Sequence, residues 1–429
     1  MSDTTITFAP ARRAAAPWRP ILTKDLADRA RSAIELIDHD LAQRADELVD
    51  NPSLSSGAAG LALYYAYQFQ ANNSPRHEQR AMDWLERAIT GTCRQSLAPG
   101  LYSGFTGIGW TLAHLSGEDD RTDDQQFTII DDALAMVLER PTAEHEYDLI
   151  SGLVGLGVYA VERSPSPTAT AMLKQVINHL QHRAMHTPDG TTWWTPAAEL
   201  RPADRAEFRG GYANLGVAHG VPGVIGLLSQ SIARGVAVGQ SITLIDGAVR
   251  WLLAQRLPAN LDGHFGYHAS AGVSSEPARL AWCYGDLGIA ATLLTAGQAT
   301  GEAAWKRQAV RIALTAAQRS IASSGVEDAA LCHGAAGVAH LFNRLYQATG
   351  EPELLDAAQR WFAATLRLHN AEHGVGGFPA RQTQGPQAGQ WTDEPGFLEG
   401  AVGVALALLA ATTNIASAWD RVLLASLPS

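Results

Sequence analysis

The sequence predicts an all-α protein, an α/α toroid with seven inner and seven outer helices around a central cavity. Two observations support this fold class. A Gly-x-x-Gly motif that runs into apolar residues recurs seven times, and an amphipathic segment precedes each copy. A composition rich in Gly, Ala and Leu agrees with tightly packed helices. An open helical solenoid built from the same repeats is the alternative arrangement.

Each copy of the motif continues directly from its second glycine into Leu, Ile or Val. The copies are SGAAGLALYY (56–65), SGFTGIGWTL (103–112), SGLVGLGVYA (151–160), HGVPGVIGLL (219–228), YGDLGIAATL (284–293), HGAAGVAHLF (333–342) and EGAVGVALAL (399–408). With 40 glycines in 429 residues, chance alone gives roughly four bare Gly-x-x-Gly matches. The apolar continuation and the near-regular spacing therefore carry the signal. Two further matches, which begin at Gly263 and Gly374, run into an aromatic and then polar residues and are predicted to be loops.

The segments between the motifs have apolar residues at helical spacing and one polar face. They predict outer helices near 27–48, 79–93, 127–140, 169–185, 241–257, 305–324 and 352–370, with a last helix near 418–427. The motif helices are apolar nearly all round and are therefore predicted to be the buried, inner ones. Paired glycines are tolerable there if they let backbones approach closely. We expect residues 1–26 to be an N-terminal extension, 27–429 to be a single domain, and 186–215 and 371–398 to be irregular loops.

Composition argues against several classes of protein. The formal net charge is −11 and Lys and Arg do not cluster, which argues against a nucleic-acid-binding protein. The N-terminal residues lack the apolar core of a signal peptide, and the sequence contains no uncharged apolar stretch of about 18 residues. The three cysteines, Cys93, Cys283 and Cys332, are too few for a disulfide framework and indicate a reducing, cytoplasmic location.

The position just before each first glycine collects polar side chains. These residues are Ser56, Ser103, Ser151, His219, Tyr284, His333 and Glu399. The three serines are predicted to be N-caps. Because equivalent positions of a toroid lie near one end of its cavity, Cys283, Cys332 and His333 can converge there.

Two thiolates and one imidazole suit zinc, and three protein ligands leave the open fourth position of a catalytic site. The alternative is that the two cysteines merely pack as small buried side chains. Cys93 follows an outer helix away from this end, and we expect it to pack rather than bind metal.

Five blocks resemble the signature blocks of the lanthionine cyclases, the LanC-like family. They are YDLISGLVGLG (147–157), NLGVAHGVPG (214–223), RLAWCYGDLGIA (279–290), LCHGAAGVAHL (331–341) and GFLEGAVGVALAL (396–408). The resemblance covers about residues 50–410, and the pair of WCYG and CHG is its most specific part. It implies a seven-fold α/α toroid with one catalytic zinc held by Cys283, Cys332 and His333. It also implies active-site roles for Asp148, His219, Arg279 and Tyr284, whereas Glu399 is assigned no role.

The resemblance implies the addition of a peptide cysteine to a dehydrated Ser or Thr of the same peptide. The substrate thiolate would take the open zinc position, and His219 would act as acid or base. Arg279 would hold the developing oxyanion or the substrate backbone, Asp148 would orient Arg279 or His219, and Tyr284 would donate a hydrogen bond. The expected substrate is a dehydrated precursor peptide, and a separate dehydratase is the expected partner because the sequence has no dehydratase-sized extension.

Three other functions remain open at this point. A LanC-like glutathione transferase would add glutathione to dehydrated residues, and a zinc-bearing scaffold would bind a peptide without turnover. A different toroid enzyme is the third alternative. Glycosidases need a spaced carboxylate pair, whereas the motif position offers only Glu399. Zinc prenyltransferases use an Asp–Cys–His ligand set, which differs from two Cys and one His.

Overall fold

A computed structural model describes residues 18–45, 50–117, 120, 122–382 and 388–427. Seven helices of the described residues begin at a Gly-x-x-Gly motif and are called motif helices here. They are α2 (Ala58–Asn72), α4 (Phe105–Leu115), α7 (Leu153–Arg163), α10 (Val221–Ala233), α12 (Asp286–Thr300), α14 (Ala335–Thr349) and α16 (Ala401–Thr412). The amphipathic helices are α1 (Lys24–Gln43), α3 (Pro75–Arg94), α6 (Asp124–Leu138), α8 (Pro167–Arg183), α11 (Val238–Ala254), α13 (Ala303–Gln318) and α15 (Pro352–Arg367). All of the predicted helix pairs are therefore confirmed, with ends that differ by a few residues.

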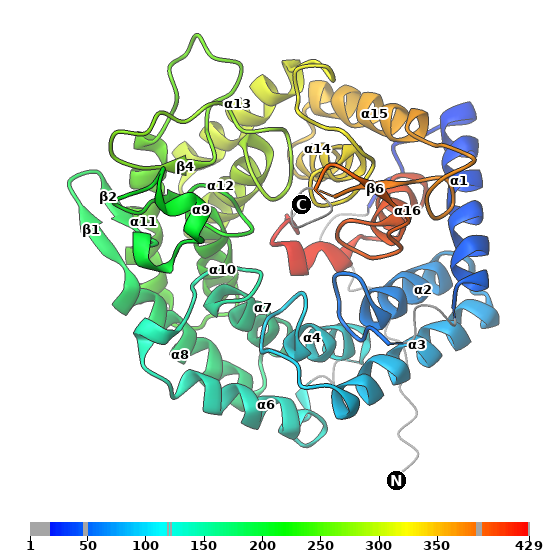
Figure 1. Cartoon of the computed structure of the whole chain (residues 1–429), viewed down its shortest axis with the longest axis horizontal. Helices are drawn as coiled ribbons and strands as arrows, with labels where there is room; N and C mark the ends of the chain where they lie inside the picture. The colour runs from blue at the N-terminus through cyan, green and yellow to red at the C-terminus, as the bar shows by residue number, and fades with distance from the viewer. Residues whose placement is uncertain (1–17, 46–49, 118–119, 121, 383–387, 428–429) are drawn as a thin grey trace. The chain divides into compact units, whose positions relative to one another are not determined.

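The chain divides into two compact units, residues 1–130 with 326–421 and 428–429, and residues 131–325 with 422–427. In the first unit the motif helices pack in the order α4, α2, α16, α14, and α3, α1 and α15 lie against them (Figure 1). In the second unit α7, α10 and α12 pack in that order, covered by α8, α11 and α13. The expected single domain from residue 27 onward stays a prediction.

Burial separates the two kinds of helix as the sequence pattern indicates. Every residue of α16 from Ala401 to Ala411 is buried, whereas α3 buries only Ala81, Trp84, Leu85 and Ala88. The motif helices thus form the core of each unit, and the amphipathic helices keep one face in solvent.

The predicted serine N-caps are wrong. Gly57, Gly104 and Gly152 are the N-caps, and none of the three helices has a side-chain cap. Backbone carbonyls of the preceding loop accept the first N–H groups instead, as in the bonds from Ala58 to Asn51 and from Leu153 to Glu146. The loop doubles back over the start of the helix, and a Cβ on the first glycine would overlap a carbonyl oxygen six residues earlier. This close approach is the physical reason for the glycines.

The remaining elements are short. The described residues form three two-stranded antiparallel sheets. They pair β1 (Met185–Thr187) with β2 (Gly190–Thr192), β3 (Ala213–Asn214) with β4 (His268–Ala269), and β5 (Ala380–Arg381) with β6 (Trp391–Thr392). The 3₁₀ helices are η1 (Thr142–Glu144), η2 (Ala197–Glu199) and η3 (Ala418–Leu423), and α9 (Pro202–Arg205) is a single turn. The predicted terminal helix is thus only a 3₁₀ segment, while the segments at Gly263 and Gly374 are loops as expected. Among the described helices, none is both long enough and apolar enough to cross a bilayer.

A buried ionic cluster attaches the segment around Asp420 to α14. Asp420 accepts from His340 Nε2 at 2.7 Å and from both Nε and Nη2 of Arg344, at 2.5 and 2.7 Å. Burial alone would raise the pKa of Asp420, but the Arg344 guanidinium and His340 outweigh it and hold the pKa below its usual value. Burial lowers the pKa of His340 and outweighs the attraction of Asp420. Both groups therefore bind protons less readily in the folded protein than in the unfolded chain.

Acidification should destabilise the protein through this cluster. The contribution of neutral His340 is present above its usual pKa of 6.5 and is lost as the pH falls toward its folded pKa. The contribution of Asp420 is lost only below 3.8. Between pH 7 and 5 we expect the free energy of unfolding to fall with a slope of up to about 1 kcal/mol per pH unit from this histidine. Urea unfolding at several pH values measures the slope. His340→Gln keeps a hydrogen-bond donor for Asp420 and should reduce the pH dependence of the free energy of unfolding. The control, His373→Gln, changes an exposed histidine and should leave this pH dependence as in the parent. Equal slopes in both variants would contradict the assignment of the pH dependence to His340.

Candidate active site

Asp148 and His219 form a hydrogen-bonded pair in the second unit. Oδ1 of Asp148 accepts from the backbone N–H groups of Ser151 and Gly152, each at 2.9 Å, ahead of α7. Oδ2 lies 2.5 Å from Nδ1 of His219, the residue before the first glycine of α10. Because a carboxylate only accepts, Nδ1 carries the proton of this bond and Nε2 is left to face other groups. Of the two partners expected for Asp148, the structure pairs it with His219.

The environment of His219 favours its charged form. Burial lowers the pKa of His219, but the hydrogen bond and charge of Asp148, with further negative charge at Cys283 and Glu146, outweigh burial and raise it. The imidazole is 41% exposed, whereas the Asp148 side chain is only 11% exposed. A fixed carboxylate thus holds a histidine that still reaches solvent, an arrangement suited to proton transfer.

Tyr284 is packed against the segment that leads to His219. Asn214 Nδ2 donates to its hydroxyl oxygen at 3.0 Å, and its ring centroid lies 5.2 Å from that of Tyr267 and 6.5 Å from that of His219. A Cβ at Gly216 would overlap both the Tyr284 ring and the carbonyl oxygen of Cys283. Glycine at position 216 is therefore what lets this segment lie directly on the WCYG block.

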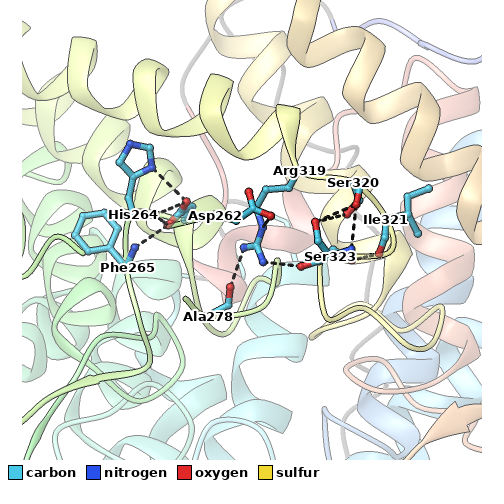
Figure 2. Close-up of polar contacts among 10 residues, drawn as sticks. Asp262, His264, Phe265, Ala278, Arg319, Ser320, Ile321 and Ser323 are labelled. Carbon is cyan, nitrogen blue, oxygen red and sulfur yellow. Dashed lines mark hydrogen bonds and ion pairs between the residues drawn. The ribbon is translucent and has the colours of Figure 1, made fainter. Parts of the chain in front are cut away.

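The backbone at Arg279 is fixed by its neighbours. Its N–H donates to the Tyr267 hydroxyl at 3.0 Å, and the next N–H, of Leu280, donates to Ser324 O at 2.8 Å. The guanidinium of buried Arg319 donates to Ala278 O at 2.8 Å and to Ser323 O at 3.0 Å (Figure 2). Arg319 thus ties the end of α13 to the residue before Arg279.

The start of α12 is anchored in a similar way. Asp286, three residues after Cys283, is buried and accepts from the backbone N–H groups of His264 and Phe265. Figure 2 shows these two residues close to the Arg319 contacts. The Cys283 carbonyl accepts from Ala218 N at 3.4 Å. Hydrogen bonds at Cys283 itself and at Asp286 therefore fix the backbone around the cysteine.

Among the described residues, the candidate metal ligands are Cys283 in the second unit and Cys332 and His333 in the first. All three residues are buried, and neither cysteine forms a disulfide. Cys332 is held through its N–H, which donates to Leu398 O at 2.8 Å. Two sulfurs and one imidazole nitrogen are a soft donor set, and this donor set fits zinc.

Cys93 behaves differently from the expectation. It lies near the C-terminal end of α3, as expected, but it is exposed, so the prediction that it packs is wrong. Positions in the last turn of an amphipathic helix face solvent unless another element covers them.

Sequence reasoning missed Asn214, Tyr267 and Arg319, which contact or position the expected residues. Asn214 is the first residue of the NLGVAHG block, and its place in that block is the one feature of the sequence that could have marked it as a site residue. Nothing in the sequence around Tyr267 or Arg319 marks either residue, because their partners lie far away along the chain.

These features define an all-α repeat protein with two cysteines and a histidine as candidate metal ligands and with a carboxylate–histidine pair. The sequence model of the lanthionine synthetase C-like protein family matches residues 49–424, and the chain belongs to this family. Among its relatives, the nisin biosynthesis protein NisC of Lactococcus lactis subsp. lactis is 24% identical over 320 residues, which cover 68% of this chain and 74% of NisC. The glutathione S-transferase LANCL1 of Danio rerio is 28% identical over 143 residues, covering 33% of this chain and 32% of LANCL1.

Two solved structures are similar to the chain in fold. Nisin cyclase matches with a TM-score of 0.72 at 20% identity, covering 91% of this chain and 96% of that protein. A sugar epimerase from a ruminal bacterium matches with a TM-score of 0.50 at 10% identity, covering 90% of this chain and 98% of the epimerase. The likeness to nisin cyclase shows the fold, and the expected all-α class, an α/α toroid, is confirmed.

Proposed function

We propose that the protein is a zinc-dependent lanthipeptide cyclase. It adds cysteine thiolates of a precursor peptide to dehydroalanine or dehydrobutyrine of the same peptide and so forms lanthionine or methyllanthionine rings. One observation carries the proposal: a member of the lanthionine synthetase C-like family carries the candidate metal ligands Cys283, Cys332 and His333. The likeness to NisC, a nisin biosynthesis protein by its name, supports the proposal that the substrate is a peptide.

Cys283, Cys332 and His333 would hold one zinc ion. When bound, the metal lowers the pKa of a thiol that coordinates it, so that the thiol reacts as thiolate near neutral pH. The residues around these ligands keep them in place. The backbone of Cys283 is fixed by Ala218 and that of Cys332 by Leu398.

His219 is the proposed acid or base. When the new C–S bond forms at the β-carbon, the electron pair of the C=C bond shifts into the bond between the α-carbon and the carbonyl carbon, and the C=O pair moves to the oxygen. The resulting enolate takes a proton at the α-carbon, which restores the carbonyl group. His219 can deliver that proton from Nε2 because Asp148 holds the other ring nitrogen. The raised pKa of His219 favours the protonated form from which delivery starts.

Arg279 and Tyr284 are the proposed groups that stabilise the enolate oxygen. A guanidinium and a phenolic O–H are both donors, and fixed donors stabilise developing negative charge without reorganising. The backbone bonds of Arg279 and the packing of Tyr284 against Tyr267 supply this rigidity. The proposed partners are a dehydrated precursor peptide and a separate dehydratase. Three cysteines, none of them in a disulfide, support a cytoplasmic location.

The test offers the purified, zinc-loaded protein a dehydrated peptide with one internal cysteine, in the presence of glutathione. After alkylation of remaining thiols, mass spectrometry separates three products. A peptide that gains neither alkyl group nor glutathione has cyclised, which is the expected result.

Two other results would overturn the proposal. Addition of glutathione would instead assign a transferase, in line with the likeness to LANCL1. An alkylated peptide with no thioether, obtained with several precursor peptides, would favour the peptide-binding scaffold.

A further inference from the structure

Asn214 is buried beside Tyr284, and its amide can take only one orientation. Oδ1 accepts from the backbone N–H of Gly216 at 2.8 Å. An amide NH₂ could not accept that hydrogen, so Nδ2 is the atom that lies 3.0 Å from the Tyr284 hydroxyl. The side chain cannot turn away, because Asn214 is 5% exposed and its backbone belongs to β3, paired with His268.

This orientation decides where the hydroxyl proton of Tyr284 lies. The Nδ2 group carries two hydrogens and no lone pair, so the tyrosine oxygen must accept from it. The hydroxyl proton then points away from Asn214, and Tyr284 acts as a donor toward any group on its other side. Tyr284 directly follows Cys283, and its ring lies 6.5 Å from His219.

We propose that Asn214 is a positioning residue that turns the hydroxyl proton of Tyr284 toward the substrate carbonyl oxygen. This inference rests on the proposed cyclase function and deepens it. The enolate formed during addition needs a donor at its oxygen, and a tyrosine free to rotate would present its lone pairs for part of the time. Asn214 excludes that rotamer, so the stabilisation is in place before the reaction begins.

The first experiment reverses the direction of the hydrogen bond between residue 214 and Tyr284 and keeps the shape of the side chain at position 214. In Asn214→Asp a carboxylate keeps the acceptor for Gly216 N, but it draws the Tyr284 proton toward itself. We expect kcat for cyclisation to fall on the order of a hundredfold, as in Tyr284→Phe. KM should stay within about twofold, because the interaction forms only in the transition state. Asn214→Ala, which merely frees the hydroxyl, should lose less.

A double-mutant comparison separates positioning from simple damage. If Asn214 acts through Tyr284, then Asn214→Asp in the Tyr284→Phe background causes no further loss. Multiplied losses, or parental kcat in Asn214→Asp, would overturn the proposal. Asn343→Asp places an acid at another fully buried asparagine and should keep parental kcat. Zinc content and thermal unfolding identify any variant that fails to fold, and then Asn214→Ala is used in both backgrounds.

An infrared measurement without substrate keeps this inference separate from the proposed function. With ring-labelled tyrosine, the C–O stretching band that disappears in Tyr284→Phe belongs to Tyr284, one of ten tyrosines. The frequency of this band differs between a hydroxyl that accepts and one that donates. We expect it to shift in Asn214→Asp, and an unchanged band would overturn the inference whether or not any peptide cyclises.

Discussion

Replacing Cys332 with alanine is expected to remove the metal and the cyclase activity together. The parent should bind about one zinc per chain, because the two cysteines and the histidine supply three soft donors. Loss of one ligand should weaken zinc binding by more than the roughly 10–100-fold that loss of an outer-shell partner costs. Metal analysis after dialysis, with chelator competition for the affinity, measures the change.

The matched control for this prediction is Cys93→Ala. Cys93 is exposed on α3, so its removal should leave both zinc content and cyclisation at parental values. Stoichiometric zinc in Cys332→Ala would place the metal elsewhere. An equal loss of zinc in both variants would also contradict the assignment of ligands.

Asp148→Asn is expected to lower kcat about 10²–10⁴-fold, the range of a general acid or base. The amide keeps an oxygen for Ser151 and Gly152, but its NH₂ group cannot accept the His219 Nδ1 proton. The imidazole then carries its proton on Nε2 when neutral and loses the carboxylate that raises its pKa. Single-turnover kinetics on a peptide with one ring measures the chemical step.

Asp246→Asn is the matched control for Asp148→Asn. Asp246 lies on α11 of the same unit, its side chain is 61% exposed, and its partner is Arg250 in the next turn. Its replacement should leave kcat unchanged. A kcat for Asp148→Asn within about threefold of the parent would remove the Asp148–His219 pair from the mechanism.

The pattern of apolar and polar residues within single segments predicts most of the fold and some of the candidate site residues. Helices such as α13 and α16 were predictable because apolar spacing and all-round apolarity are properties of one segment. Cys283, Cys332 and His333 are candidates from the sequence because they lie at or beside equivalent positions of a repeat. The sequence leaves both Arg279 and His219 open as partners of Asp148. The contact with His219 depends on how two separate loops fold together.

The failures share one physical cause, contacts between segments that local pattern does not encode. The serines were expected to cap helices because a polar residue before a glycine is a usual cap, but the loop carbonyls already fill that role. The Asn214–Tyr284 bond joins residues 70 positions apart and depends on two loops meeting. Exposure of Cys93 depends on what covers the last turn of α3, which its own sequence does not state.

The backbone caps of the motif helices have an evolutionary consequence. Since loop carbonyls satisfy the first N–H groups of α2, α4, α7, α14 and α16, the residue before each first glycine has no duty in starting the helix. Selection can therefore exchange that side chain at little cost to folding. Serine, histidine and glutamate occupy this one place in different repeats. In such a repeat protein, the residue before each first glycine can change one repeat at a time, so new functional side chains can arise at this position while the helices keep their structure.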